Sequence, residues 1–267
     1  MKLLKITEGD LGKLDKYFED SATIGVEEIS PRVVDNEIGI TLGGKEIADF
    51  DAAYAEIPVK NAVFGRVLLE ILEELDMNLN YSSTAFFAMA KKNYLYQVLH
   101  QKGIDAPKTA VIADEKSVRN MENHLKGPLV ATRYNNLEEK EKARIDTVEG
   151  IGEFVEGLEY GEGVAVFREL EKGEKYLCLA VGNTVISLKD DTDGWKFERD
   201  RMKYSTVSSE LEQKVLRTRK VLGSNLCEVK LRGEKIVDVN PNPDLQRFKE
   251  ISGKDTFGNA AEVLKED

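Results

Sequence analysis

The chain has 267 residues, of which 41% are hydrophobic and 33% are charged, so it can bury a substantial core and is long enough for two lobes. A net charge of −11 argues against general nucleic-acid binding, because phosphate contacts need a basic face. No apolar run approaches the roughly 20 residues of a membrane span, and the start turns polar too soon for a signal peptide, so we expect a cytoplasmic protein.

Strands and helices are predicted to alternate along the chain, which favours α/β or α+β architecture over a bundle or a sandwich. The order of elements suggests three lobes, over residues 1–82, 83–155 and 156–267. The first is predicted to hold a short apolar strand, a helix over 11–18, a hairpin over 37–47 that turns at Gly43-Gly44, a strand over 52–55 and a helix over 63–75. Ser82, Ser83 and Thr84 are candidate N-caps for the next helix.

The second lobe is predicted to contain helices over 86–90 and 94–102 and strands over 109–112 and 128–133. The third is predicted to contain strands over 164–169, 175–181 and 184–188, a helix over 209–222 and a closing hairpin. Between two strands lies the charged run from Leu137 to Arg144, which we interpret as a mobile loop. Cys178 and Cys227 lie in apolar strands and are expected to be core residues rather than a disulfide or a metal pair.

The closing hairpin carries oxygen ligands in the run Val237-Asp238-Val239-Asn240-Pro241-Asn242-Pro243. Period-two alternation puts Asp238 and Asn240 on one face of a strand, and the turn at Gly233 would bring Glu228 beside them. Such oxygens suit magnesium or manganese, which usually bridge protein to phosphate, so the motif indicates a nucleotide. The alternative is a polar turn that closes an ordinary hairpin.

Several other runs match one known family in their residues and in their order. They are Gly44-Lys45 with Phe50-Asp51-Ala52, Tyr81-Ser82-Ser83 with Ala90-Lys91-Lys92, the segment from Leu99 to Thr109, the segment from Leu179 to Val185, and the segment from Asp238 to Pro243. Together they resemble the ATP-grasp superfamily, specifically its RimK-like glutamate ligase branch, over almost the whole chain. The resemblance implies an ATP-grasp fold behind an N-terminal pre-ATP-grasp domain, with ATP clamped between two antiparallel sheets.

The resemblance also implies a reaction and a set of residues. ATP phosphorylates a carboxylate, and an amine, such as that of glutamate or another amino acid, attacks the acyl phosphate to give an amide. By position, Lys92 would contact the ATP phosphates, Glu169 would bind the ribose hydroxyls, and Glu228, Asp238 and Asn240 would hold magnesium or manganese.

The chain departs from the family at three places. The strand lysine over the phosphates is missing, and Arg133 is the nearest replacement. The glycine-rich loop is replaced by the charged run, in which Lys140 and Lys142 with Arg144 could neutralise phosphate as a charged lid. The substrate arginine is also missing, and the cluster Arg199, Arg201 and Lys203 either replaces it or forms a solvated loop of mixed charge.

Two classes of function therefore stay open: an ATP-dependent carboxylate–amine ligase, and a non-catalytic ATP-grasp relative that acts as a nucleotide-binding regulatory or scaffold protein. The convergence of metal ligands favours the first, and the three departures favour the second. The sequence names neither the acid nor the amine, and it leaves the oligomeric state open, a homo-oligomer included.

Overall fold

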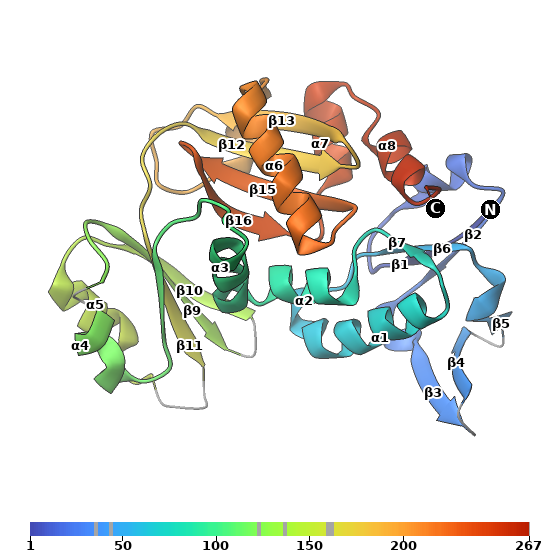
Figure 1. Ribbon diagram of the computed structural model, residues 1–267, viewed down its shortest axis with the longest axis horizontal. Helices are drawn as coiled ribbons and strands as arrows, with labels where there is room; N and C mark the ends of the chain where they lie inside the picture. Colours follow the sequence, from blue (N-terminus) through green and yellow to red (C-terminus); the bar gives the residue numbers. More distant parts are fainter. Residues whose placement is uncertain (35–36, 43–44, 122–123, 136–137, 159–162, 267) are drawn as a thin grey trace.

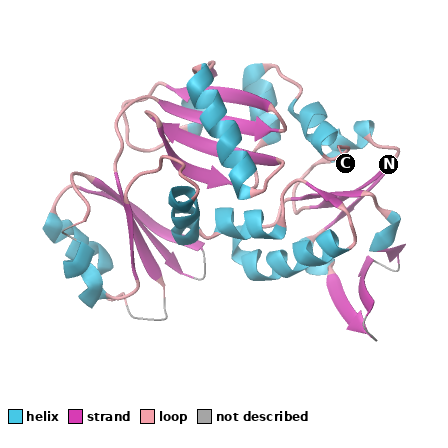
Figure 2. Cartoon of the chain, viewed as in Figure 1, coloured by secondary structure: helices cyan, strands magenta, loops and turns pink. Residues whose placement is uncertain are grey.

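The computed structural model describes residues 1–266 except 35–36, 43–44, 122–123, 136–137 and 159–162. Figure 1 shows three larger sheets. The sheet of β8–β11 lies at one end of the molecule, the N-terminal sheet lies at the other end, and the sheet of β12–β16 lies between them. Figure 2 shows helices against each of these sheets, so the architecture is mixed α and β, as the alternation of elements predicts. Within the described ranges, no helix is long and apolar enough to cross a membrane.

The N-terminal sheet has the order β2-β1-β6-β7, and every neighbouring pair in it is parallel. Its strands are β1 (Lys2–Ile6), β2 (Asp20–Ile24), β6 (Ala52–Ala55) and β7 (Asn78–Leu79). The predicted helix over 11–18 is a 3-10 helix (Gly12–Tyr17), and the predicted hairpin belongs to a small sheet of β3 (Ser30–Val34), β4 (Glu37–Leu42) and β5 (Lys45–Glu46). The turn predicted at Gly43-Gly44 lies outside the described residues.

Apolar residues cover both faces of this first sheet. On one face, Leu4 and Ala53 pack in one cluster with residues of α1 (Ala62–Glu74) and α2 (Ser83–Ala90). On the other face, Leu3 and Tyr54 join a cluster with α7 (Leu245–Ser252) and α8 (Thr256–Val263), the last helices of the chain. The two ends of the chain therefore close one core. The Ser82 hydroxyl accepts a hydrogen bond from the Ala85 amide at 3.1 Å, which confirms it as the N-cap of α2.

The second sheet is antiparallel, with the order β10-β9-β11-β8. Its strands are β8 (Thr109–Ile112), β9 (Leu129–Asn135), β10 (Glu138–Ile145) and β11 (Val164–Glu169). The short helices α4 (Val118–Met121) and α5 (Val148–Val155) pack on one face over Leu129, Ala131 and Phe167. The opposite face is left for contact with the third sheet.

The third sheet is antiparallel and has the order β14-β13-β12-β15-β16. Its strands are β12 (Lys175–Val181), β13 (Thr184–Asp190), β14 (Met202–Tyr204), β15 (Leu226–Arg232) and β16 (Lys235–Asn240). The helix α6 (Ser209–Leu222) lies across one face (Figure 1), and α3 (Lys92–Gln101) reaches the sheet near β16. Cys178 and Cys227 are buried and unpaired thiols in this core, as predicted.

Candidate active site

A cavity of about 300 Å³, lined mainly by charged residues, lies between the second and third sheets. Side chains of β9, β10 and β11 form one wall, β15 and β16 form the other, and the segment 195–199 closes one side. The cationic lining residues are Lys142, Arg168, Lys196, Arg199, Lys230 and Arg232, and the acidic ones are Glu139, Glu169, Glu171 and Asp238. Its size falls within the range of small-molecule sites, and its excess of cations suits an anionic ligand.

Alternation along β15 explains how the third sheet builds this wall. Cys227, Val229 and Leu231 point into the apolar core, so Glu228 and Lys230 point to the other face. The antiparallel register pairs Glu228 with Asn240 and Lys230 with Asp238. The turn between the strands holds Gly233 at φ +56°, where a side chain would collide with the Lys172 carbonyl. The hairpin thus brings all three predicted metal ligands to one face.

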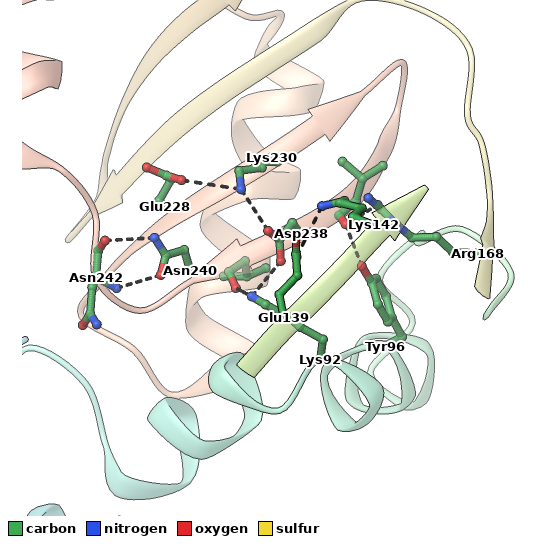
Figure 3. Close-up of polar contacts among 12 residues, drawn as sticks. Lys92, Tyr96, Glu139, Lys142, Arg168, Glu228, Lys230, Asp238, Asn240 and Asn242 are labelled. Atoms are coloured by element: carbon green, nitrogen blue, oxygen red, sulfur yellow. Dashed lines mark hydrogen bonds and ion pairs between the residues drawn. The ribbon is translucent and has the colours of Figure 1, made fainter. Parts of the chain in front are cut away.

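Asp238 lies between two lysines that come from different elements (Figure 3). The Lys92 ammonium, on the first residue of α3, is 2.7 Å from Asp238 Oδ1, and the Lys230 ammonium is 3.0 Å from Oδ2. Lys92 also donates a hydrogen bond to the Val239 carbonyl at 2.6 Å. Burial opposes ionisation of the Asp238 carboxyl, but the two ammonium groups outweigh it and hold its pKa well below the usual value.

Glu228 is the most deeply buried charged group of the site, with 0% of its side chain exposed. Its Oε1 accepts a hydrogen bond from Arg199 at 2.8 Å and lies 4.0 Å from the Lys230 ammonium. Its Oε2 has no hydrogen-bond partner among the residues that the structure describes. Burial raises the pKa of this carboxyl, although Lys230 and Arg199 act in the opposite direction.

Asn240, the last residue of β16, makes its side-chain hydrogen bonds to the backbone of the turn that follows the strand. Its Oδ1 accepts from the Asn242 amide at 3.2 Å, and its Nδ2 donates to the Asn242 carbonyl at 2.9 Å. Asn242 in turn donates to the Ile57 carbonyl at 2.8 Å, and its Oδ1 accepts from the Tyr81 hydroxyl at 3.3 Å. The end of β16 is therefore fixed to the N-terminal sheet region.

Among the oxygens of Glu228, Asp238 and Asn240, one is better placed than the others to bind a magnesium ion. Glu228 Oε2 is a buried carboxylate oxygen without a hydrogen-bond donor, which is the kind of ligand that magnesium prefers. Both Asp238 oxygens and the Asn240 oxygen already contact lysines or an amide. Across the described part of the chain, no group of three or more His, Cys, Asp or Glu side chains is placed to hold a metal ion.

Two side chains tie the cavity walls together at one carbonyl. Arg168 of β11 donates a hydrogen bond to the Val237 carbonyl at 2.6 Å, and the buried Tyr96 hydroxyl of α3 donates to the same oxygen at 2.9 Å (Figure 3). Burial raises the pKa of Tyr96 to about 12, so its hydroxyl stays a donor at neutral pH. The second sheet, α3 and the third sheet meet at this point.

The charged run after Leu137 is not the mobile loop that its composition indicates. It forms β10, which pairs with β9 from Glu138 to Ile145, and Leu137 itself lies outside the described residues. A bulge between Glu139 and Glu141 sets Lys140 out of register, so Glu139 and Lys142 both line the cavity. Burial lowers the pKa of the Lys142 ammonium, while Glu139, 3.7 Å away, acts in the opposite direction.

A buried ion pair holds the segment that closes the cavity. Lys175 and Asp190 are 2.8 Å apart, and their side chains are 3% and 0% exposed. Lys175 donates to the Lys196 carbonyl at 2.9 Å, and Asp190 accepts from the Glu198 amide at 2.8 Å. This pair places Trp195 and Arg199 at the cavity, and it leaves Lys175 pointing into the fold rather than toward a ligand.

Six predicted site residues are not part of the cavity lining. Lys92, Glu228 and Asn240 lie around Asp238, which does line it, whereas Arg133, Lys140 and Arg201 lie elsewhere. Arg133 has the strand parity of Leu129 and Ala131, so it points toward α5, where it donates to the Phe154 carbonyl and covers the Phe154 ring. Lys140 is exposed and pairs with Glu138. Arg201 is exposed in a 3-10 helix that also contains Arg199. Glu169 does line the cavity, and it accepts a hydrogen bond from the Lys126 amide at 3.0 Å.

Several residues at the site were not predicted from the sequence. Lys230, Arg232 and Trp195 line the cavity, and Tyr96 fixes its inner end. Lys230 could have been found, because period-two alternation from Glu228 places it on the same face. Tyr96 and Trp195 offer no such signal, since their positions depend on contacts between distant segments.

The chain is similar in sequence to proteins named probable alpha-L-glutamate ligase. It is 25% identical to the one from Vibrio vulnificus (strain YJ016) over 251 residues, which cover 87% of this chain and 82% of that protein. It is also 25% identical to the one from Syntrophotalea carbinolica over 240 residues, which cover 83% of this chain and 77% of that protein. No protein-family model matches the chain.

Solved structures of ATP-grasp proteins share the fold over nearly its whole length. The RimK domain protein from Sphaerobacter thermophilus aligns with a TM-score of 0.72 at 16% identity, over 98% of this chain and 99% of that one. The D-alanine–D-alanine ligase from Bacillus anthracis, solved in complex with ATP, aligns with a TM-score of 0.69 at 15% identity, over 99% and 97%. The chain therefore has the ATP-grasp fold, and in sequence it resembles the RimK-like glutamate ligases of that superfamily.

Proposed function

We propose that this chain is an ATP-dependent carboxylate–amine ligase that works through an acyl phosphate, with glutamate or another amino acid as the amine. The observation that carries the proposal is the cavity between the two antiparallel sheets, where Lys142, Arg168 and Lys230 converge. This cavity is where the fold is expected to hold ATP, and its cations suit a triphosphate. The names of the sequence relatives support glutamate as the amine.

The reaction needs ATP because a carboxylate is a poor electrophile. One carboxylate oxygen would attack the γ-phosphorus and release ADP, and the amine nitrogen would then bond to the acyl carbon while inorganic phosphate leaves and the nitrogen loses a proton. The protein contributes position and charge neutralisation rather than covalent chemistry. Magnesium, or manganese in its place, would neutralise phosphate charge, with Glu228 Oε2 as its open ligand beside Asp238 and Asn240.

Five cations at or beside the cavity have a place in this proposal. Lys142 and Arg168 on the second sheet would face the phosphates from one side, and Lys230 would face them from the other. Lys92 is not part of the lining and would act from beside it, through its ion pair with Asp238. Arg199 would bind the carboxylate substrate, since its side chain is 40% exposed and lines the cavity. Arg133, Lys140 and Arg201 lie outside the cavity lining and have no part in it.

The test is phosphate release from ATP in a screen of carboxylic acids and amino acids. A ligase should release phosphate when an acid and an amine are both present and release little with either alone, because the acyl phosphate must be formed and then captured. Arg199→Met should abolish the stimulated release, and Arg201→Met, its exposed neighbour in the same 3-10 helix, should not.

A nucleotide-binding protein without catalysis is the second candidate. This candidate is favoured because Asp238 and Glu228 are already paired with lysine and arginine side chains. Of their oxygens, within the described part of the chain, only Glu228 Oε2 is then left to bind a metal ion. Tight ATP binding with no stimulated phosphate release across the screen would replace the ligase proposal with this one.

A further inference from the structure

Lys230 lies where two carboxylates converge. Its ammonium nitrogen is 3.0 Å from Asp238 Oδ2 and 4.0 Å from Glu228 Oε1, and Figure 3 shows it pointing between the two side chains. Its side chain is 23% exposed, and it lines the cavity. Converging carboxylate oxygens are ligands that a divalent ion prefers, and here the ammonium group of a lysine lies among them.

The local charge balance supports this reading of Lys230. Glu228 and Asp238 carry at most two negative charges, and three cations contact them directly: Lys92, Lys230 and Arg199. A divalent ion placed between the same carboxylates would lie against the Lys230 ammonium. Two positive charges in contact repel each other strongly in a partly buried site. The carboxylates are therefore neutralised before any ion or nucleotide arrives.

We propose that the Lys230 ammonium replaces a divalent cation in holding the nucleotide phosphates, so that this chain binds ATP with little dependence on magnesium. The inference rests on the nucleotide site of the proposed function. Magnesium would then serve phosphoryl transfer rather than ATP affinity. Lys142 and Arg168, on the opposite wall, complete a set of protein cations around the phosphates.

The main experiment is calorimetric titration of ATP into the parent protein and its variants, in buffer with magnesium and in buffer with EDTA. The parent should bind ATP in EDTA within about threefold of its affinity in magnesium. Lys230→Met should lose about tenfold or more in EDTA and regain most of it in magnesium, because the ion can now enter. Lys230→Arg keeps the charge and should behave like the parent.

Lys189→Met is the matched control. Lys189 lies on β13 of the same sheet, has a side chain 29% exposed and pairs with Glu174, but it does not line the cavity. This variant should show the affinities of the parent in both buffers. Thermal unfolding of each variant checks the fold, and Lys230→Met should stay folded because Lys92 still pairs with Asp238.

A second measurement needs no nucleotide. Manganese(II) titrated alone, followed by its electron paramagnetic resonance signal, should bind Lys230→Met at least about tenfold more tightly than the parent. The inference is overturned if ATP binding to the parent requires magnesium, or if Lys230→Met responds to magnesium and manganese as the parent does. ATP binding in neither buffer overturns the proposed function, and this inference with it.

Discussion

At the residue scale, a buried ion pair holds the segment that closes the cavity. The Lys175–Asp190 pair is almost fully buried, and hydrogen bonds from Thr192 and Glu198 satisfy the carboxylate as well. Breaking such a pair on one side leaves an uncompensated charge in the fold, which costs more than the pair contributes when intact. The segment that carries Trp195 and Arg199 depends on this pair.

Asp190→Asn tests the pair through its pH dependence. Burial raises the pKa of Asp190, but Lys175 and the hydrogen-bond donors outweigh burial and lower the pKa from 3.8 to about 2. Because the folded pKa is below the unfolded one, the contribution to stability is complete above pH 4 and is lost as the pH falls toward 2. The substitution should lower the free energy of unfolding by about 2 kcal/mol or more at pH 7.

Urea denaturation of parent and variant across this pH range measures the effect. The stability difference should shrink as the medium is acidified, because the parent loses the same charge by protonation. Asp191→Asn is the control: Asp191 is exposed and its cationic contacts are at 3.6 and 3.7 Å, so its loss should cost within about 0.5 kcal/mol. A difference for Asp190→Asn that is the same at pH 7 and near pH 2 would contradict this account.

At the scale of single elements, the bulge in β10 decides which charges face the cavity. Before the bulge Glu139 pairs with Tyr134, and after it Lys142 pairs with Thr132, so both share the face of β9 that looks toward the third sheet. Lys140, within the bulge, has no partner in this register and pairs with Glu138 at the surface. Two lysines of one strand thus have different surroundings.

Lys142→Ser and Lys140→Ser form a matched pair of variants. Lys142→Ser should weaken ATP binding by about tenfold at low salt, because it removes a phosphate-facing cation, and the loss should be smaller at high salt. Lys140→Ser should change the affinity by less than about twofold, since its ammonium is exposed. Titration calorimetry at two salt concentrations measures both, and equal losses would show that β10 acts through its net charge alone.

The whole molecule is held together by contacts between segments that are far apart in the chain. The last helices, α7 and α8, pack against the first strand, and both chain ends lie at the same side in Figure 1. Phe248 is 0% exposed within this cluster, together with Leu3 and Tyr54. The N-terminal sheet therefore needs the C-terminal helices to cover one of its faces.

Phe248→Ala should lower the free energy of unfolding by about 3 kcal/mol or more, because it leaves a cavity in this shared core. Hydrogen exchange should rise in β1 and β6 as well as in α7, since these elements lose a common support. Tyr204→Ala, at a residue that is 44% exposed, is the control and should cost less than about 1 kcal/mol. Faster exchange confined to α7 would mean that the N-terminal sheet is stable without it.

The Arg168 and Tyr96 bonds to Val237 join the sheets at the cavity. Arg168→Met should increase hydrogen exchange in β9–β11 while leaving β12–β15 unchanged, because it removes a link between the sheets and no core contact within the third one. Exchange monitored by mass spectrometry distinguishes this from general destabilisation, in which both sheets would exchange faster.

Much of this protein follows from the sequence by itself. The strands over 52–55, 109–112, 164–169 and 175–181 and the helix over 209–222 have the bounds that local patterns predict, because each is a long or strongly apolar segment bounded by polar residues. Alternation also predicts that Glu228, Asp238 and Asn240 share one face, since the side-chain period of a strand is a local property.

The rest was decided by tertiary structure. The charged run forms β10 because β9 offers its backbone hydrogen bonds, although its side chains alone favour a solvated loop. The bulge shifts Lys140 away from the cavity and Lys142 toward it, and strand parity turns Arg133 to the far face. One partner of Asp238, Lys230, comes from the same hairpin, but the other, Lys92, comes from α3 and reaches Asp238 only through long-range packing. Local patterns specify which residues share a face, but which charges meet across a cavity depends on long-range register and packing, which no short stretch of sequence contains.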